Sequence, residues 1–217
     1  MIPIEREPEP QILASKKTEW LAKFLARRAK DPKARPDSKK YAHSEVTGAL
    51  RRMGHGKCFY CERKLETGAQ HVDHHIEVFE SPELAFTWDN LYLSCKDCNN
   101  AKRKKSPTLD QCIDPCDPGA RPEAHLTFDD EIIRPREDSD RGRATIRKYS
   151  LDDPLLDLQR LRALRELWRA VDRLKDHRIA DKGRPLTADE RELLLSFKQP
   201  ERPFSLMFRV ALRVLDP

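Results

Sequence analysis

The chain has 217 residues, of which 38% are hydrophobic and 36% are charged, and its formal net charge is +5. This length can bury a core as one large domain or two small ones, and no apolar run approaches the length needed to span a bilayer. Residues 1–5 lack the basic-then-apolar pattern of a signal peptide. We therefore expect a reducing, cytoplasmic setting in which cysteines bind metal rather than form disulfides.

The positive charge is concentrated at the two ends of the sequence. Residues 1–57 hold 14 lysines and arginines against 7 acidic residues, and residues 155–217 hold 14 against 10, whereas the middle is slightly acidic. Basic ends of this kind can flank a polyanion that lies over an acidic, metal-binding centre. A balance this mild is equally typical of helices that lysine and arginine simply solvate.

The first quarter of the chain predicts an extended arm followed by two helices. Three early prolines favour the arm, and an apolar face over 16–30 predicts the first helix, which Asp31-Pro32 ends. Residues 33–40 read as a basic, mobile loop. A second helix over 44–53 then leads into Gly54-His55-Gly56 and the first cysteine pair.

The middle of the chain predicts a small ββα unit. Residues 70–79 are strand-like and pair with a neighbouring short strand, 88–94 form an ordering loop, and 98–105 begin a helix. From 106 to 153 the sequence is rich in proline and aspartate with little periodicity, which predicts long irregular connections packed on this unit.

The last third is predicted to be helical. Apolar residues recur there at spacings of three and four, namely Leu155, Leu158, Leu161, Leu164, Trp168, Val171 and Leu174. Gly183-Arg184-Pro185 breaks the pattern, Thr187 to Glu190 form a capping box, and a final helix starts near Pro203. The predicted fold is α+β and mostly helical. It has an arm and helices at 1–54, a ββα-metal module at 55–110, an irregular connection at 111–154 and a helical region at 155–217.

Two Cys-x-x-Cys pairs give the strongest chemical signal. Cys58 and Cys61 form the first pair, and Cys95 and Cys98 form the second after a gap of 33 residues. Each pair supplies two soft ligands from one tight turn, so the two pairs together predict a closed, tetrahedral, structural zinc site. Four buried free thiols would be a poor explanation of this spacing.

The stretch between the pairs carries an acid and a histidine side by side, Asp73-His74. A bare dipeptide of this kind is usually a surface or core histidine. Phosphodiester cleavage, however, needs a base for water and a divalent cation for the phosphate. His74 can accept a proton, and the oxygens of Asp73 or Asn99 suit Mg²⁺ or Mn²⁺.

Asp73-His74, Asn90-Leu91 and Asn99-x-x-Lys102, framed by the cysteines, resemble an HNH endonuclease with the ββα-metal fold. The resemblance covers about a quarter of the chain. It implies that Asp73 and Asn99 bind the catalytic Mg²⁺ or Mn²⁺ and that His74 is the general base. It also implies that Asn90 orders the loop and positions the base, and that Lys102 contacts a phosphate.

Two features depart from the usual HNH pattern. The family commonly has a proline three residues after the histidine, where this chain has Glu77, which adds negative charge near the metal. His71 and His75 also lie close by, and a register shifted by one residue would turn His75 rather than His74 to the site. We favour His74 because it directly follows the acid.

Basic residues follow the motif directly, in the run Lys102, Arg103, Lys104 and Lys105. Beside an active site such a run favours contact with nucleic acid, although elsewhere it would be a solvated helix face. Cys112 and Cys116 form a separate pair without obvious partners. They read either as free thiols or, with His125, as a second metal site.

A narrower resemblance extends beyond the motif. Gly56 to Glu62, Trp88-x-Asn90-Leu91, Cys98-Asn99 and Thr145-Ile146 before Leu151 look like the HNH subunits of Septu-type anti-phage systems and their retron-associated relatives. Those subunits act with an ABC-type ATPase, which implies a defence role and a protein partner. The nuclease reading takes DNA as the target, although the sequence does not separate DNA from RNA. The C-terminal helices and the basic N-terminal arm would be reasonable docking surfaces for that partner.

Two other readings stay open at this stage. A non-catalytic zinc module that binds nucleic acid or protein would keep the four cysteines but would not need Asp73, His74 and Asn99 together. A nuclease that is silent alone and active only within an ATPase complex would have the same sequence signature as a free-standing enzyme.

Overall fold

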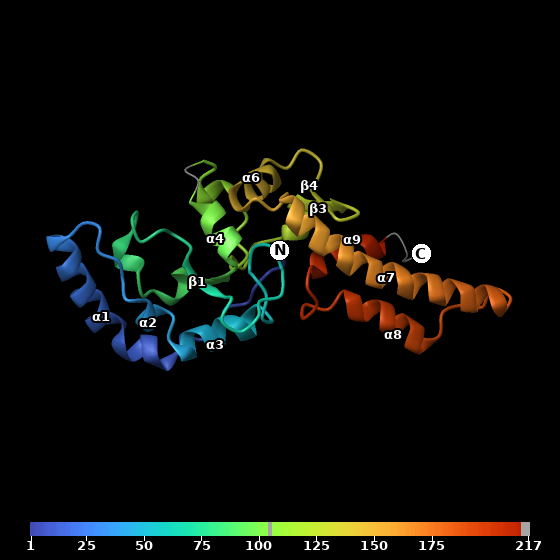
Figure 1. Cartoon of the computed structure of the whole chain (residues 1–217), viewed down its shortest axis with the longest axis horizontal. Coiled ribbons are helices and arrows are strands. Elements are labelled where there is room, and N and C mark those ends of the chain that lie inside the picture. Colours follow the sequence, from blue (N-terminus) through green and yellow to red (C-terminus); the bar gives the residue numbers. More distant parts are fainter. Residues whose placement is uncertain (104–105, 214–217) are drawn as a thin grey trace.

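The computed structural model describes residues 1–103 and 106–213 and shows an elongated molecule with a small mixed module at its centre (Figure 1). Three N-terminal helices lie at one end, and a long helical hairpin projects at the other. Among the described helices, none combines the length and apolar character needed to cross a membrane.

The N-terminal helices are α1 (Gln11–Lys30), α2 (Ser38–Tyr41) and α3 (Ser44–Met53). The bounds of α3 are those predicted, whereas α1 begins five residues earlier, directly after Pro10. The prediction of a mobile loop over 33–40 was wrong at its end, because the Asp37 side chain accepts a hydrogen bond from the Lys39 N–H and caps α2.

The central module contains strands β1 (His71–His74) and β2 (Leu91–Ser94), helix α4 (Lys96–Lys102) and two short 3₁₀ helices, η1 (Pro82–Leu84) and η2 (Trp88–Asn90). The strands pair antiparallel, and their register sets Asp73 opposite Tyr92 and His74 opposite Leu91. The ββα unit is thus confirmed. The predicted strand over 70–79 was too long, and residues 91–94 are a strand rather than a loop. Every β2 side chain is buried, which hides the alternation that marks a strand.

Residues 106–153 are not irregular, contrary to the prediction. They form η3 (Leu109–Gln111), α5 (Pro122–His125), a hairpin of β3 (Leu126–Asp129) and β4 (Ile132–Pro135), and α6 (Asp140–Tyr149). Helix α6 packs on both α4 and β4. At this crossing Gly142 lies directly against the His125 carbonyl, where a side chain would not fit.

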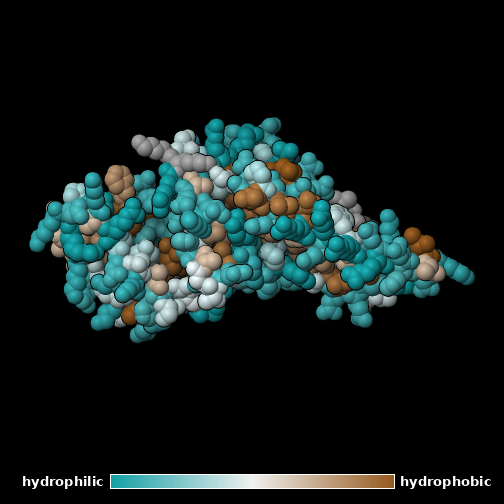
Figure 2. All heavy atoms as spheres, viewed as in Figure 1, coloured by the Kyte–Doolittle hydropathy of each residue, from teal (hydrophilic) through white to brown (hydrophobic). Residues whose placement is uncertain are grey.

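The C-terminal region is helical, as predicted, with α7 (Pro154–Ala180), α8 (Ala188–Phe197) and α9 (Ser205–Arg213). Helices α7 and α8 lie side by side in the projecting hairpin (Figure 1), and the capping box at Thr187 is present. The surface in Figure 2 is mostly hydrophilic, with small apolar patches over both ends of α7. Leu155 and Ile179, next to the two ends of α7, are 69% and 70% exposed.

A buried ionic cluster joins the central module to α9. Glu62, 2% exposed, accepts hydrogen bonds from the Met1 amine (2.5 Å), the Lys57 ammonium (3.2 Å) and the Ser205 hydroxyl (2.6 Å). The two cations hold the pKa of Glu62 well below its usual range even though burial opposes this. The turn that carries Cys58 and Cys61 is therefore anchored from both ends of the chain.

Candidate active site and zinc site

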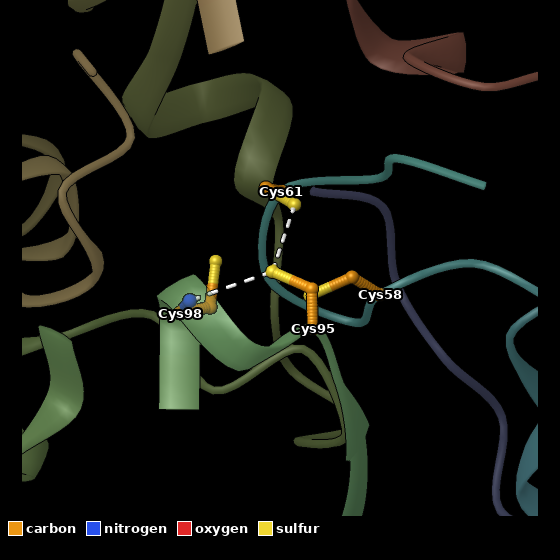
Figure 3. A group of neighbouring side chains, drawn as sticks. All are labelled: Cys58, Cys61, Cys95 and Cys98. Atoms are coloured by element: carbon orange, nitrogen blue, oxygen red, sulfur yellow. Dashed lines mark hydrogen bonds between the residues drawn. The ribbon is translucent and has the colours of Figure 1, made fainter. Parts of the chain in front are cut away.

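The four predicted zinc ligands converge at one point. Figure 3 shows the side chains of Cys58 and Cys61 from the first turn pointing toward those of Cys95 and Cys98 at the start of α4. All four are buried, and their sulfur atoms lie within 4.8 Å of one another, with 3.9 Å between Cys61 Sγ and Cys95 Sγ. Among the described residues this is the one cluster of cysteine, histidine and acidic side chains with such geometry.

The cluster fits a tetrahedral zinc ion. A Zn–S distance of about 2.3 Å implies sulfur separations of roughly 3.8 Å, which agrees with the observed packing. Hydrogen bonds from the other three thiols lower the pKa of Cys95, whereas burial raises that of Cys58 and hydrogen bonds with the neighbouring thiols raise that of Cys98, so the four groups do not share their protons evenly. With four sulfur ligands the site has no position for substrate, and its contribution is to hold the first turn against α4.

Asp73 lies on β1 and is fully enclosed. Its side chain is 3% exposed, with Oδ1 2.7 Å from Lys102 Nζ and Oδ2 accepting a hydrogen bond from the Tyr60 hydroxyl at 2.9 Å. Burial raises the pKa of Asp73, while the ion pair with Lys102 and the bond from Tyr60 oppose that rise. Tyr60 lies between Cys58 and Cys61 in sequence, so the turn that carries these two cysteines directly supports the Asp73 carboxylate.

His74, the next residue, faces the other side of the strand. Its ring is nearly buried and packs edge-on against Tyr41, with 4.6 Å between ring centroids. Nε2 lies 2.9 Å from the Ala85 carbonyl, which assigns the proton to Nε2 and leaves Nδ1 as the acceptor. Burial lowers the pKa of His74, so the imidazole is neutral at physiological pH.

Asn90 closes the loop between the strands. Its Oδ1 accepts a hydrogen bond from the Ile76 N–H at 2.7 Å, and its amide donates to the carbonyls of Ile76 at 3.0 Å and Leu84 at 3.3 Å. The Asn90 carbonyl also accepts from the His75 N–H. One buried side chain thus joins the end of β1 to the segment that presents the Ala85 carbonyl to His74.

Lys102, which the resemblance assigns to a phosphate contact, is buried in this structure. Its side chain is 1% exposed and turns inward from α4, because the helix packs that face onto β1. Besides Asp73, the ammonium hydrogen-bonds the His74 and His75 carbonyls and lies 3.4 Å from Glu77 Oε1. Glu77 does bring its charge to this site, where the usual HNH pattern has proline.

Asn99 lies on α4 one turn before Lys102, and its side chain is partly exposed. Within the described residues its side-chain amide makes no hydrogen bond. Arg103 ends the helix and is exposed. Lys104 and Lys105, the rest of the predicted nucleic-acid contact, lie outside the described residues.

The neighbouring histidines occupy different surroundings. His71 is exposed at the start of β1. The His75 ring stacks on Tyr92 at 4.5 Å, and its Nε2 is 3.9 Å from Asp114. Burial lowers the pKa of His75 to about 4, so His75 is neutral at pH 7 and its contact with Asp114 is no ion pair there.

Cys112 and Cys116 are free thiols. Cys112 donates a hydrogen bond to the Thr108 carbonyl, and burial raises the pKa of both groups, to about 11 for Cys112 and about 12 for Cys116. His125, the predicted third member of a second metal site, instead bonds Ser139 through Nδ1 at 2.8 Å.

Two residues at the site escaped the sequence analysis. Tyr60 binds Asp73 and stacks on Tyr149 at 4.1 Å, and Tyr41 covers His74. The position of Tyr60 inside the first Cys-x-x-Cys turn was a usable signal, because that turn has to lie beside β1. Tyr41 carries no such signal, since it belongs to the short helix α2 that the sequence did not predict.

Comparison with known proteins identifies the domain that carries these residues. Residues 58–105 match the family model of the HNH endonuclease. A Septu protein PtuB of Bacillus mycoides (strain KBAB4) is 27% identical over an aligned length of 203, and the match covers 77% of this chain and 68% of that protein. A Septu protein PtuB of Bacillus thuringiensis is 36% identical over an aligned length of 72, and the match covers 30% of this chain and 28% of that protein. The chain is therefore a nuclease with an HNH endonuclease domain at residues 58–105, and it is related to the Septu PtuB proteins.

Proposed function

We propose that this chain is a metal-dependent endonuclease that hydrolyses DNA phosphodiester bonds, with His74 as the general base. The observation that carries the proposal is the state of the His74 ring. It is neutral because it is buried, and the Ala85 carbonyl fixes the proton on Nε2. Nδ1 is then the atom that takes a proton from the attacking water.

The proposed ligands of a hard cation are Asp73, which directly precedes this base on β1, and Asn99 on α4. Asp73 and Asn99 offer a carboxylate and an amide oxygen, which are ligands that Mg²⁺ and Mn²⁺ prefer. An ammonium group, that of Lys102, already lies at Asp73, which supports the view that this position favours positive charge. A divalent cation held there would stabilise negative charge on the phosphate and on the leaving oxygen.

The ligands of the two metal sites support different roles, one structural for zinc and one catalytic for Mg²⁺ or Mn²⁺. Four sulfurs enclose the zinc position, so zinc fixes the turn that carries Tyr60 and the start of α4. Tyr60 and Lys102 in turn hold Asp73. We infer that zinc acts on catalysis only through this support.

Plasmid cleavage tests the proposal. Purified wild-type chain and the variant His74→Ala are incubated with supercoiled DNA, and in parallel with single-stranded RNA, in Mg²⁺ or Mn²⁺. We expect the wild type to cut the DNA and His74→Ala to lose cleavage while it keeps its zinc and its circular dichroism spectrum. Undiminished cutting by the variant would refute the assignment, and preferential cutting of RNA would refute the choice of DNA.

We further propose that the chain is the effector nuclease of a cytoplasmic anti-phage defence system and works with an ATPase. The similarity to Septu PtuB proteins over 77% of the chain supports this role. Co-expression with an ATPase encoded beside it, followed by size-exclusion chromatography, tests the partnership. A stable complex is expected, and separate elution at micromolar concentration would count against it.

A further inference from the structure

The Lys102 ammonium lies in a shell made entirely of oxygen atoms. Oδ1 of Asp73 is 2.7 Å away, the His75 carbonyl 3.2 Å and Oε1 of Glu77 3.4 Å, and the His74 carbonyl also accepts a hydrogen bond from it. The Lys102 side chain is 1% exposed, so these oxygens replace the water that would otherwise surround the ammonium.

This shell is the kind of site that a divalent cation uses. Carboxylate and carbonyl oxygens are the ligands of Mg²⁺ and related hard cations, and a lysine ammonium carries only half their charge. The shell also has unused capacity. Glu77 Oε1 is a buried oxygen with no hydrogen bond among the described residues. Two carboxylates therefore face a single monovalent group.

A divalent cation would compete with Lys102 for Asp73 as it stands here. The second carboxylate oxygen, Oδ2, is taken by the Tyr60 hydroxyl at 2.9 Å, which leaves Oδ1 as the oxygen that a metal would use. Lys102 already occupies that oxygen. Two like charges on one oxygen, with little water to screen them, repel strongly.

We propose that Lys102 is a placeholder cation, which neutralises Asp73 in the metal-free protein and leaves it when a divalent cation binds. This proposal depends on the proposed function in one respect, because it assumes that Asp73 is a ligand of the catalytic cation. Lysine suits such an exchange because its charge sits at the end of four flexible methylene groups. Once displaced, the ammonium becomes free to contact a phosphate. The phosphate contact that the resemblance assigns to Lys102 would therefore form only in the metal-loaded protein.

Metal binding by Lys102→Met tests the proposal without any cleavage assay. Methionine keeps much of the side-chain volume and removes the charge. Manganese binding to zinc-loaded protein is measured by isothermal titration calorimetry and by the loss of the free Mn²⁺ electron paramagnetic resonance signal. Lys102→Met is expected to bind Mn²⁺ at least about tenfold more tightly than the wild type, because the competing charge is gone.

A matched control is available on the same helix. Lys96 lies in the first turn of α4 and is exposed, so Lys96→Met removes the same charge at a distance from the shell. Its Mn²⁺ affinity should equal that of the wild type. Equal or weaker Mn²⁺ binding by Lys102→Met would overturn the proposal.

Loss of Lys102 also leaves Asp73 buried without its counter-ion, which is destabilising. If Lys102→Met is unfolded without metal, the proposal predicts that Mn²⁺ restores its circular dichroism spectrum. The double variant Asp73→Asn/Lys102→Met removes both charges. It should fold without Mn²⁺ and should gain no thermal stability from it. Failure of Mn²⁺ to restore Lys102→Met, or a Mn²⁺-induced rise in Tm of the double variant, would contradict the exchange.

The outcomes separate this proposal from the proposed function. If Lys102→Met binds Mn²⁺ more tightly but the wild type cuts no nucleic acid, the exchange stands and the nuclease assignment falls. If the wild type cuts DNA and its Mn²⁺ affinity matches that of Lys102→Met, the nuclease stands and the exchange falls.

Discussion

Replacing Asn90 with alanine removes the side chain that joins the end of β1 to the loop before β2. Three hydrogen bonds are lost, at 2.7, 3.0 and 3.3 Å, and all three involve the backbone of Ile76 or Leu84. Asn90 is 5% exposed, whereas Ile76 is only half-buried, so water can reach some of the groups that lose their partner.

The expected cost follows from these contacts. A hydrogen bond of this kind contributes about 1 kcal/mol net, and a buried polar group without a partner costs about 1–3 kcal/mol. With partial access of water, we expect Asn90→Ala to lower the free energy of unfolding by about 2–4 kcal/mol. At roughly 2–4 °C per kcal/mol, Tm would fall by about 4–16 °C.

Chemical and thermal unfolding of zinc-loaded protein measure this loss. Asn100→Ala is the matched control, because Asn100 is an exposed asparagine on α4, and its effect should stay within about 0.5 kcal/mol. Cleavage by Asn90→Ala should also fall at temperatures where it is folded, since the same loop presents the Ala85 carbonyl to His74. An unfolding free energy within about 0.5 kcal/mol of that of Asn100→Ala would refute the reasoning.

Cys95→Ser should lose its bound zinc, measured by atomic emission, and unfold at least in the central module, whereas Cys116→Ser should keep one zinc per chain. His75 stays neutral in the folded protein down to about pH 4 but takes up a proton in the unfolded chain near pH 6.5. Protonation of the unfolded chain therefore lowers the free energy of unfolding as the pH falls between these two values. His75→Gln should therefore lose less stability than the wild type from pH 7 to pH 4.5 in urea unfolding, and equal losses would contradict the burial of a neutral ring. Gly142→Ala should cost about 1–3 kcal/mol because its methyl group meets the His125 carbonyl, whereas the helical Gly48→Ala, which meets only ordinary contacts, should be neutral or stabilising.

The sequence predicted best those features that depend on local spacing. The Cys-x-x-Cys pairs had to form a cluster, because each turn presents two sulfurs to one ion. The bounds of α3 and the capping box before α8 also follow from patterns within a few residues. These signals do not depend on which distant segment packs against them.

Features set by packing between distant segments were missed. Strands β3 and β4 have four residues each, contain proline and aspartate, and turn through Asp130 with a positive φ of 52°, so their sequence reads as a loop. The burial of Lys102 could not be predicted from the local sequence for the same reason. In a run of basic residues it resembles a surface group, and only the packing of α4 onto β1 turns it toward Asp73.

Separating the two metals tests the central claim most directly. Protein is dialysed against a chelator weak enough to leave the cysteine-bound zinc, its zinc content is verified at one ion per chain, and plasmid cleavage is measured before and after Mg²⁺ or Mn²⁺ is added. We expect no cleavage by the zinc-only protein and full cleavage after the second cation is added, with the zinc content unchanged. Full cleavage by protein that holds one zinc and no other divalent cation would contradict it.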